Sequence, residues 1–331
     1  MTENDGMISP SLPAALKAAL DAKLHGLSRS DAAVRAALIS QTYRDGGGSG
    51  TIRTEADALA YALARMPATY AAVTACLSAL LDVRPAFAPQ SLLDVGAGPG
   101  TASFAAAEAF ASLQSFALLD RNSALRALAS ELARESVRLS KLNYTAGEAR
   151  TTLAQAGLAD LVIASYVIGE LSETERDELT ALAWSKTADT LLFVEPGTPA
   201  GYARIMAART RLIASGAHVA APCPHDSSCP LTPPDWCHFA QRLARSRAHK
   251  EIKGAELPFE DEKFSYVIVA RAPAPKRLTR VLAEPAVGKV EVAAKLCTAR
   301  GVTLAKVPRR DKSAYAAARH WRWGDGLMEE S

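Results

Sequence analysis

A predicted strand that runs directly into a glycine-rich turn constrains this fold more than any other feature. The segment from Leu92 to Thr101 reads LLDVGAGPGT, with residues typical of a buried strand followed by a turn that opens a helix. Glycines permit positive φ and let the backbone approach a ligand closely. One residue separates the last two glycines, whereas the dinucleotide fingerprint has two there. The turn therefore predicts an α/β fold with a ligand site and disfavours a nicotinamide cofactor.

Three acidic residues lie in or after the first predicted strands. Asp94 lies in the strand that precedes the glycines, Asp120 ends the segment Leu118-Leu119-Asp120, and Glu148 follows Gly147, before the strand at Leu161–Ala164. Together with the turn, this arrangement resembles the class I S-adenosylmethionine (SAM) methyltransferases, which have a Rossmann-like core. The resemblance implies that Asp120 accepts hydrogen bonds from the ribose and that Glu148 lies at the adenine edge. The predicted SAM-binding residues are Asp94, Gly96, Gly98, Gly100, Asp120 and Glu148.

Short apolar runs alternate with helical stretches from Ser91 onward. This rhythm is typical of buried parallel strands joined by crossover helices. The predicted strands are Leu92–Val95, Phe116–Leu119, Leu161–Ala164, Leu191–Val194 and Tyr266–Ala270. We expect an N-terminal helical region at 1–88, interrupted by a loop at 43–50. A methyltransferase-like core follows at 89–272 and includes a cysteine loop at 221–239. The chain then ends in a basic, β-rich C-terminal extension at 273–331, with short strands at 289–296 and 302–307.

Four of the five cysteines follow the predicted core strands. Cys223, Cys229 and Cys237 lie in one proline-punctuated stretch, and Cys297 lies far downstream. Structural zinc sites favour tight cysteine pairs, whereas iron–sulfur clusters take four thiolates at more varied spacing. The residues alone therefore leave two possibilities open. One is an iron–sulfur cluster with Cys297 as the fourth ligand, and the other is a zinc site in which His225 or His238 completes three cysteines.

The first residues and the apolar runs give expectations about location. The N-terminal MTENDG is acidic and lacks a basic segment followed by an apolar one, so no targeting segment is visible. From the sequence we expect no apolar run long enough to span a bilayer. We therefore expect a cytoplasmic protein with no membrane partner, in which clustered thiols stay reduced and available to metal.

The net charge of +3 conceals a basic C-terminal segment. Residues 271–322 contain thirteen Lys or Arg against three acids, a local charge of +10. A second basic run, at residues 242–253, directly follows the cysteine stretch. A solvated surface would explain either run alone. Their joint position beside the cysteines favours an RNA phosphate footprint.

The end of the predicted strand at Leu161–Ala164 carries no recognisable methyl-acceptor motif. Enzymes that methylate exocyclic amines have Asn/Asp-Pro-Pro-aromatic there, whereas this chain has Ser165-Tyr166-Val167-Ile168. Cys223 follows a later strand, which disfavours it as the nucleophile of a cytosine-C5 methyltransferase. No catalytic residue is assigned.

Several sequence blocks resemble the Rsm family of small-ribosomal-subunit methyltransferase-like proteins of bacteria and mitochondria. The blocks are Leu93–Gly100, VEPGTP at 194–199, APCPH at 221–225, WCHF at 236–239, FSYV at 264–267 and WGD at 323–325. The two cysteine blocks are more distinctive than the glycine turn. The resemblance covers most of the chain after residue 60.

The resemblance implies a role in assembling the small ribosomal subunit, with rRNA as partner. It also implies that Cys223, Cys229, Cys237 and Cys297 hold a four-iron, four-sulfur (4Fe–4S) cluster. Two functions stay open: an assembly or translation factor whose methyltransferase fold and SAM site serve binding, and an active SAM-dependent rRNA methyltransferase. Whether the chain is an enzyme is thus undecided by the sequence. We expect a monomer on the RNA.

Overall fold

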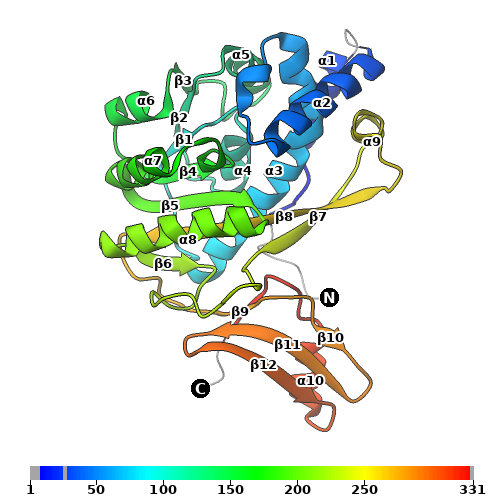
Figure 1. Ribbon diagram of the computed structural model, residues 1–331, viewed down its shortest axis with the longest axis vertical. Helices are drawn as coiled ribbons and strands as arrows, with labels where there is room; N and C mark the ends of the chain where they lie inside the picture. Colours follow the sequence, from blue (N-terminus) through cyan, green and yellow to red (C-terminus); the bar gives the residue numbers. More distant parts are fainter. Residues whose placement is uncertain (1–7, 25–27, 329–331) are drawn as a thin grey trace.

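The structure, a computed structural model, describes residues 8–24 and 28–328, so the acidic residues 1–6 lie outside the described part. Figure 1 shows a large α/β unit in the upper part of the view and a small β-rich unit below it. The ten α-helices of the described ranges are α1 Ala14–Lys23, α2 Arg29–Arg44, α3 Glu55–Val83, α4 Thr101–Ala109, α5 Ser123–Arg134, α6 Ala149–Gln155, α7 Glu173–Ser185, α8 Pro199–Ala214, α9 Arg247–Lys253 and α10 Lys312–Ala318.

One mixed sheet organises the large unit. Its strand order is β3-β2-β1-β4-β5-β8-β6, and β7 pairs with β8. The strands are β1 Ser91–Val95, β2 Ser115–Asp120, β3 Asn143–Ala146, β4 Ala159–Ser165, β5 Thr187–Pro196, β6 His218–Ala221, β7 Phe239–Ala244 and β8 Phe259–Ala270. The order reverses between β1 and β4, where open α/β sheets bind ligands. This is the class I methyltransferase fold, so the predicted fold class is confirmed.

The direction of β8 corrects one prediction. The run Tyr266–Ala270 was expected to be parallel, but β8 is antiparallel to both β5 and β6. The reason is that the chain turns back after β7, through the short helix α9, and β8 pairs antiparallel with β7 itself, so no helix crosses the sheet between them. A strand buried on both faces is apolar throughout in either direction, so the sequence pattern could not reveal the reversal.

Both faces of the sheet are covered by helices. Leu92 and Ile163 point to the face packed by α3, α4 and α5, while the adjacent Leu93 and Val162 point to the face packed by α7 and α8. Successive strand residues therefore serve opposite cores, as the alternation of side chains along a strand requires.

Helix α3 is the long buried helix of the N-terminal region. A capping box starts it, because Thr54 Oγ1 accepts from Asp57 N and the Asp57 carboxylate accepts from Thr54 N. With 29 residues and a hydropathy of 1.4 in its most apolar window, it is long and apolar enough to cross a membrane, which corrects the expectation that no such run exists. In this structure 67% of that window is buried against the core.

The C-terminal unit comprises a second sheet and α10. Its strands are β9 Thr279–Val281, β10 Ala286–Val287, β11 Glu291–Thr298, β12 Gly301–Pro308 and β13 Gly326–Leu327, in the order β10-β11-β9-β13 with β12 paired to β11. The β11–β12 hairpin turns at Gly301, whose φ is +127°. The predicted basic, β-rich extension is therefore confirmed as part of the fold, and Figure 1 shows it beneath the end of the large unit where β6 and β7 lie.

Candidate metal centre and cofactor pocket

The glycine turn between β1 and α4 forms the floor of a pocket at the carboxyl ends of the parallel strands. Gly96 and Gly98 line it with φ values of +69° and +54°. A Cβ on Gly96 would lie 2.5 Å from Val167 Cγ2, so only glycine fits there. The pocket has a volume of about 180 Å³.

Asp120 fixes the shape of this turn. Its carboxylate, at the end of β2, accepts from Gly98 N at 2.8 Å and from Asn122 N at 2.7 Å. Burial raises the pKa of Asp120, and these two backbone hydrogen bonds act in the opposite direction. Glu148 also lines the pocket, but its side chain is 69% exposed and pairs at 3.5 Å with Arg121.

Asp94 and Gly100 do not line the pocket. Asp94 is fully buried beneath the turn, where its Oδ2 accepts from Ser103 N and Oγ at 3.1 and 2.7 Å. Its Oδ1 is buried without a hydrogen-bond partner, and burial raises the pKa of Asp94 to about 7. Gly100 is the N-cap of α4. Four of the six predicted residues, Gly96, Gly98, Asp120 and Glu148, are thus brought together, and the binding role of all six stays a prediction.

The N-terminal region covers the pocket, which the sequence did not indicate. Tyr43 and Tyr61 line it, with ring centroids 6.0 Å apart. The loop before α3 is held over it because Asn122 Nδ2 donates to Ser49 O and Ile52 O, each at 2.9 Å.

Tyr166 occupies the end of β4, the position at which related amine methylases carry their acceptor motif. It has a left-handed φ of +58°, rare for a non-glycine residue. Its hydroxyl donates to Glu262 Oε1 at 2.8 Å, and Arg65 pairs with the same carboxylate at 3.1 Å. The half-buried Tyr166 therefore lines this side of the pocket, and Glu262 and Arg65 hold its hydroxyl from behind.

All four predicted metal ligands line a second cavity, where the large unit meets the C-terminal unit. Cys223, Cys229 and Cys237 come from the loop between β6 and β7, while Cys297 comes from β11. All are free thiols, and Cys223 and Cys297 are buried. The structure thus brings the four residues to one cavity across more than 70 positions of sequence.

Contacts to both units hold the cysteine loop in place. Arg209 on α8 donates to His225 O and Ser227 O, each at 2.8 Å. Ser265 Oγ on β8 donates to Cys237 O at 2.8 Å. From the C-terminal unit, Trp323 Nε1 donates to His238 O at 2.9 Å. The loop is therefore a fixed element with few free backbone groups.

The donor set fits a cluster better than a single ion. Among residues 8–24 and 28–328, no three His, Cys, Asp or Glu side chains stand close enough to share one metal ion. A tetrahedral zinc with bonds of about 2.3 Å holds its sulfurs only about 4 Å apart. In a cubane cluster each thiolate binds a different iron, so wider separations suit it.

The histidines are turned to other partners. His225 Nδ1 faces Ser227 O at 3.2 Å, and His238 stacks on Trp236 with ring centroids 5.0 Å apart. Of the two, His225 approaches a candidate ligand, with Nε2 3.9 Å from Cys297 Sγ. Two ligands of one tetrahedral zinc lie at about this separation, so the zinc alternative with His225 stays open, whereas His238 does not line the cavity.

Burial raises the pKa of the Cys223 and Cys297 thiols, whereas nearby arginines act to lower it. The pKa of Cys297 rises to about 12 through burial and the neighbouring sulfurs. Burial likewise raises the pKa of Cys223, and Arg209 acts to lower it. Without a metal these thiols are neutral, so loading a metal must release their protons.

The second basic run, residues 242–253, is neutralised by acids of β8. Arg242 pairs with its cross-strand partner Asp261 at 2.8 Å. Glu260 accepts from Arg245 at 2.8 Å and from Lys253 at 2.7 Å. Arg247 pairs with Glu251 within the run, so four of its five Lys and Arg side chains form ion pairs. This pairing leaves little free positive charge for the RNA footprint expected there, which stays a prediction.

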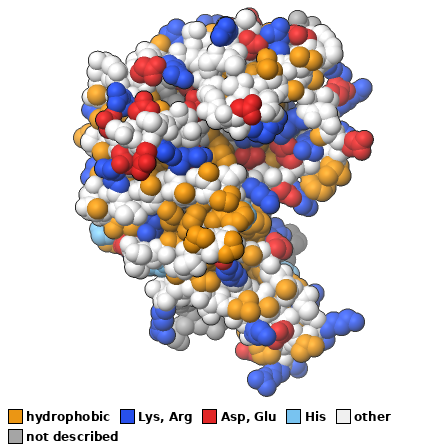
Figure 2. Space-filling view, viewed as in Figure 1, with side chains coloured by type: hydrophobic (Ala, Val, Ile, Leu, Met, Phe, Trp, Pro, Cys, Tyr) orange, Lys and Arg blue, Asp and Glu red, His pale blue; other side chains and the backbone are white. Residues whose placement is uncertain are grey.

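The C-terminal unit keeps its positive charge exposed. Figure 2 shows Lys and Arg side chains around the lower end of the molecule. Within residues 273–328, eight exposed cations form no ion pair: Lys276, Lys289, Arg300, Arg309, Arg310, Lys312, Arg319 and Arg322. This surface is the strongest candidate for binding a polyanion.

Comparison with known proteins gives a consistent family. A family model described as "Mitochondrial small ribosomal subunit Rsm22" matches residues 55–328. The human "Ribosome assembly protein METTL17, mitochondrial" is 30% identical over 300 residues, which cover 83% of this chain and 63% of the human protein. The "Rsm22-cox11 tandem protein 2, mitochondrial" of Schizosaccharomyces pombe is 27% identical over 248 residues, 66% of this chain and 32% of that protein. This chain thus spans less than two thirds of the length of these relatives.

Solved structures with a similar arrangement are methyltransferases. Magnesium protoporphyrin IX methyltransferase (ChlM) from Synechocystis PCC 6803 with bound SAM is 15% identical, with a TM-score of 0.39, covering 74% of this chain and 98% of that chain. N-methyltransferase NodS from Bradyrhizobium japonicum WM9 is 13% identical, with a TM-score of 0.37, covering 61% and 86%. The fold assignment rests on the strand order and not on these low scores.

The names of the relatives contradict the expected cytoplasmic location. That expectation rested on the composition of the first residues, whereas the human and fission-yeast relatives are mitochondrial proteins. The cytoplasmic prediction was therefore wrong. A family model that matches residues 55–328 supports the resemblance noted in the cysteine blocks, and the chain belongs to the mitochondrial small ribosomal subunit Rsm22 family.

Proposed function

We propose that this protein is an assembly factor of the small ribosomal subunit that binds rRNA and holds a 4Fe–4S cluster. The observation that carries the proposal is the convergence of Cys223, Cys229, Cys237 and Cys297 on one cavity between the two units. A human relative with 30% identity is named a ribosome assembly protein, which supports the assembly role.

The cluster would act as a structural cross-link. Three ligands belong to the large unit and Cys297 belongs to the C-terminal unit, so bound iron ties the two together. The cavity is narrow, with room for about one water molecule, so the thiols must turn outward on loading. Holding the C-terminal unit at a fixed angle fixes the position of its exposed cations.

The rRNA would be bound through the phosphate backbone. Eight exposed, unpaired Lys and Arg residues lie in the C-terminal segment. Such contacts supply affinity without reading sequence and weaken as salt rises. The target position in the rRNA is therefore set by shape and by the assembling subunit.

SAM binding is proposed for the glycine-turn pocket, as a ligand and not as a methyl donor. Asp120 lies where a ribose hydroxyl acceptor is expected, beside Gly98. The pocket volume of about 180 Å³ is below the range of about 300–1,000 Å³ common for ligand sites, so the covering loop must open for SAM. Tyr166 lines the acceptor side, held there by its hydrogen bond to Glu262.

The alternative is an active SAM-dependent rRNA methyltransferase, which the preserved glycine turn favours. For that reaction an acceptor atom must reach the methyl group in line, at near-contact distance. The Tyr166 network would have to move for a nucleotide to enter. This requirement makes the assembly factor the better-supported function.

Sedimentation with ribosomal particles tests the proposal. Purified protein is mixed with immature small subunits and centrifuged through sucrose gradients at several salt concentrations. We expect co-migration that weakens with salt and is lost in the triple variant Arg309→Glu, Arg310→Glu, Lys312→Glu. A matched triple reversal at exposed cations of the large unit, Lys17→Glu, Arg44→Glu and Lys141→Glu, keeps it.

Two results would count against the proposal. Absence of co-migration at low salt would refute the assembly role. Transfer of a labelled methyl group from SAM to the rRNA of those particles, abolished by Asp120→Asn, would establish the methyltransferase instead.

A further inference from the structure

Two arginines are buried beside the cysteine cavity. Arg209 on α8 is 3% exposed and Arg280 on β9 is 2% exposed. Arg280 lines the cavity itself, together with the four cysteines. Buried guanidinium groups are rare in proteins unless an anion compensates them.

Neither arginine has a protein anion within ion-pair distance among the described residues. Arg209 donates to the carbonyl oxygens of His225 and Ser227, it acts to lower the pKa of Cys223, and its Nε is buried without a hydrogen-bond partner. Arg280 donates to Gly324 O at 2.7 Å and to Pro222 O at 3.3 Å. Carbonyl oxygens satisfy some N–H groups but supply no full negative charge, so both buried guanidiniums lack an ion pair; Asp82 and Asp325 act on Arg280 only at longer range.

The cysteines are groups beside these arginines that become anions when they bind a metal. Arg280 on β9 and Cys297 on β11 are directly opposed in the antiparallel register. Residues opposed in this way have Cβ atoms only about 5 Å apart on one face of the sheet. Arg209 stands beside Cys223, because its guanidinium acts to lower the pKa of that thiol.

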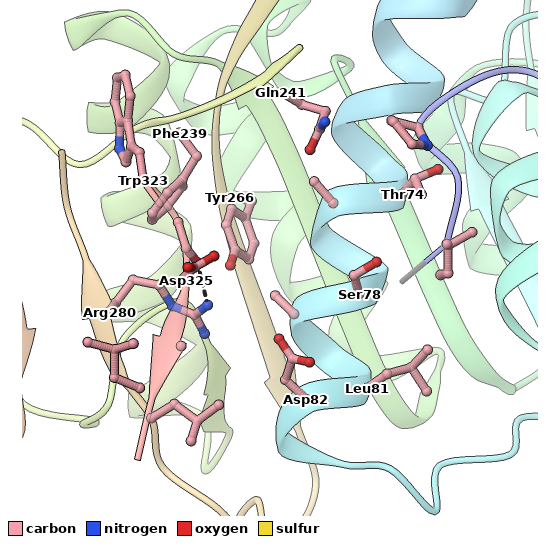
Figure 3. A pocket seen from close by; sticks show the side chains of 18 of the residues that line it. Thr74, Ser78, Leu81, Asp82, Phe239, Gln241, Tyr266, Arg280, Trp323 and Asp325 are labelled. Carbon is pink, nitrogen blue, oxygen red and sulfur yellow. Dashed lines mark hydrogen bonds between the residues drawn. The ribbon is translucent and has the colours of Figure 1, made fainter. Parts of the chain in front are cut away.

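Figure 3 shows the opposite side of Arg280, which faces an open cleft of about 880 Å³ between α3 and the C-terminal unit. Asp82 and Asp325 lie in that cleft, and neither forms an ion pair with Arg280. Arg280 and Tyr266 line both the cleft and the cysteine cavity. One layer of side chains therefore separates the cysteines from the cleft.

We propose that Arg209 and Arg280 are counter-cations for a thiolate-bound iron–sulfur cluster, stabilising its negative charge and raising its reduction potential. This inference rests on the proposed cluster site. Four thiolates make the loaded site negative, and two buried guanidiniums beside the cysteines offset that charge where little water can screen it. Both arginines also hold the loop through its carbonyl groups, so charge compensation and loop position are coupled.

The hydroxyl of Tyr202 adds a neutral contact to the same site. It lies 3.2 Å from Cys229 Sγ and can donate to the sulfur. Hydrogen bonds to ligand sulfurs and nearby charge are the levers by which proteins tune iron–sulfur potentials. Tyr202→Phe removes only the hydrogen bond and leaves both cations, so it is the matched control for charge.

The test is a redox titration of the full chain, purified without oxygen, in which electron paramagnetic resonance follows reduction by dithionite. One electron from dithionite adds one negative charge to the site, and no protein bond is formed or broken. Two variants, Arg209→Gln and Arg280→Gln, keep hydrogen-bond donors but remove the positive charge. Two others, Arg209→Lys and Arg280→Lys, keep the positive charge. Iron and sulfide per chain are measured on each sample first.

We expect each Gln variant to have an equilibrium constant for reduction about tenfold smaller, a shift of about 59 mV to lower potential for one electron. The Lys variants stay near the wild type, and Tyr202→Phe shifts less than either Gln variant. Loaded Gln variants with the wild-type potential would overturn the inference while leaving the cluster intact.

Loss of loading is also decisive. If the Gln variants take up no iron but the Lys variants do, positive charge is required and the inference stands. If both fail to load, the arginines act only through their carbonyl contacts and the inference is wrong. A wild-type chain without iron and sulfide would instead refute the proposed cluster itself.

Discussion

Asp94 makes the stability of this fold depend on pH in a direction that can be calculated. Its carboxyl group is fully buried under the glycine turn, with Oδ1 unpartnered, and burial raises its pKa from 3.8 to about 7. Between these two values the folded chain keeps the proton and the unfolded chain loses it. Stability contributed by this group is therefore present at low pH and lost as pH rises through that window.

The magnitude follows from the distance between the two pKa values. They lie about three pH units apart, and each unit corresponds to about 1.4 kcal/mol, so the ionised carboxylate costs about 4 kcal/mol above pH 7. Asp94→Asn keeps an oxygen to accept from Ser103 and cannot ionise. We expect the variant to gain about 4 kcal/mol relative to the wild type between pH 4 and pH 8.

Urea unfolding at half-unit steps of pH measures this difference. Other buried carboxyls titrate in both chains and cancel in the comparison. The surface variant Glu284→Gln controls for the change in net charge. A difference between Asp94→Asn and wild type that does not change from pH 4 to pH 8 would refute the assigned burial of this carboxylate.

Three further substitutions have expected outcomes. Asp120→Asn should weaken SAM binding in calorimetry by at least about tenfold, because charge-assisted hydrogen bonds contribute about 1.5–3 kcal/mol each; equal affinity would remove Asp120 from the site. Glu260→Gln should lower the free energy of unfolding by about 1–3 kcal/mol, since it leaves the partly exposed Arg245 and Lys253 without their carboxylate. A loss below about 1 kcal/mol would show that solvent already screens them. Gly201→Ala should lower the melting temperature, because its Cβ would lie 2.0 Å from Pro196 O. The control is Gly157→Ala, whose added Cβ would have no atom within 4 Å. A higher melting temperature for Gly201→Ala would contradict the close packing of α8 on β5.

The sequence predicted the elements whose signal is local. The runs at Leu92, Phe116, Leu161 and Leu191 became parallel strands because continuous apolar residues suit a sheet covered on both faces. The β11–β12 hairpin turned at Gly301 as its spacing indicated. The direction of β8 could not be predicted, because direction is set by the connection and not by the strand's own residues.

The residue types of the candidate site could be predicted from the sequence, whereas the groups that pack against and pair with these residues could not. The four cysteines were recognisable by type and converge on one cavity. By contrast, Asp94 shares its pattern with ligand-binding acids, and only tertiary packing put it beneath the turn. The sequence could not show that the positive charge of residues 242–253 is largely paired, because its partners Glu260 and Asp261 lie on the adjacent strand β8. Arg209 and Arg280 carried no signal that distinguishes a buried arginine from a surface one.

The content of iron, acid-labile sulfide and zinc in protein purified without oxygen tests the central claim most directly. It is measured per chain for the wild type and for Cys229→Ser, with Cys76→Ser as a control because Cys76 is buried in α3, away from the cavity. Four cysteines holding a 4Fe–4S cluster predict about four irons and four sulfides in the wild type and the control, and a loss of both in Cys229→Ser. One zinc without sulfide, or no metal at all, would contradict the account.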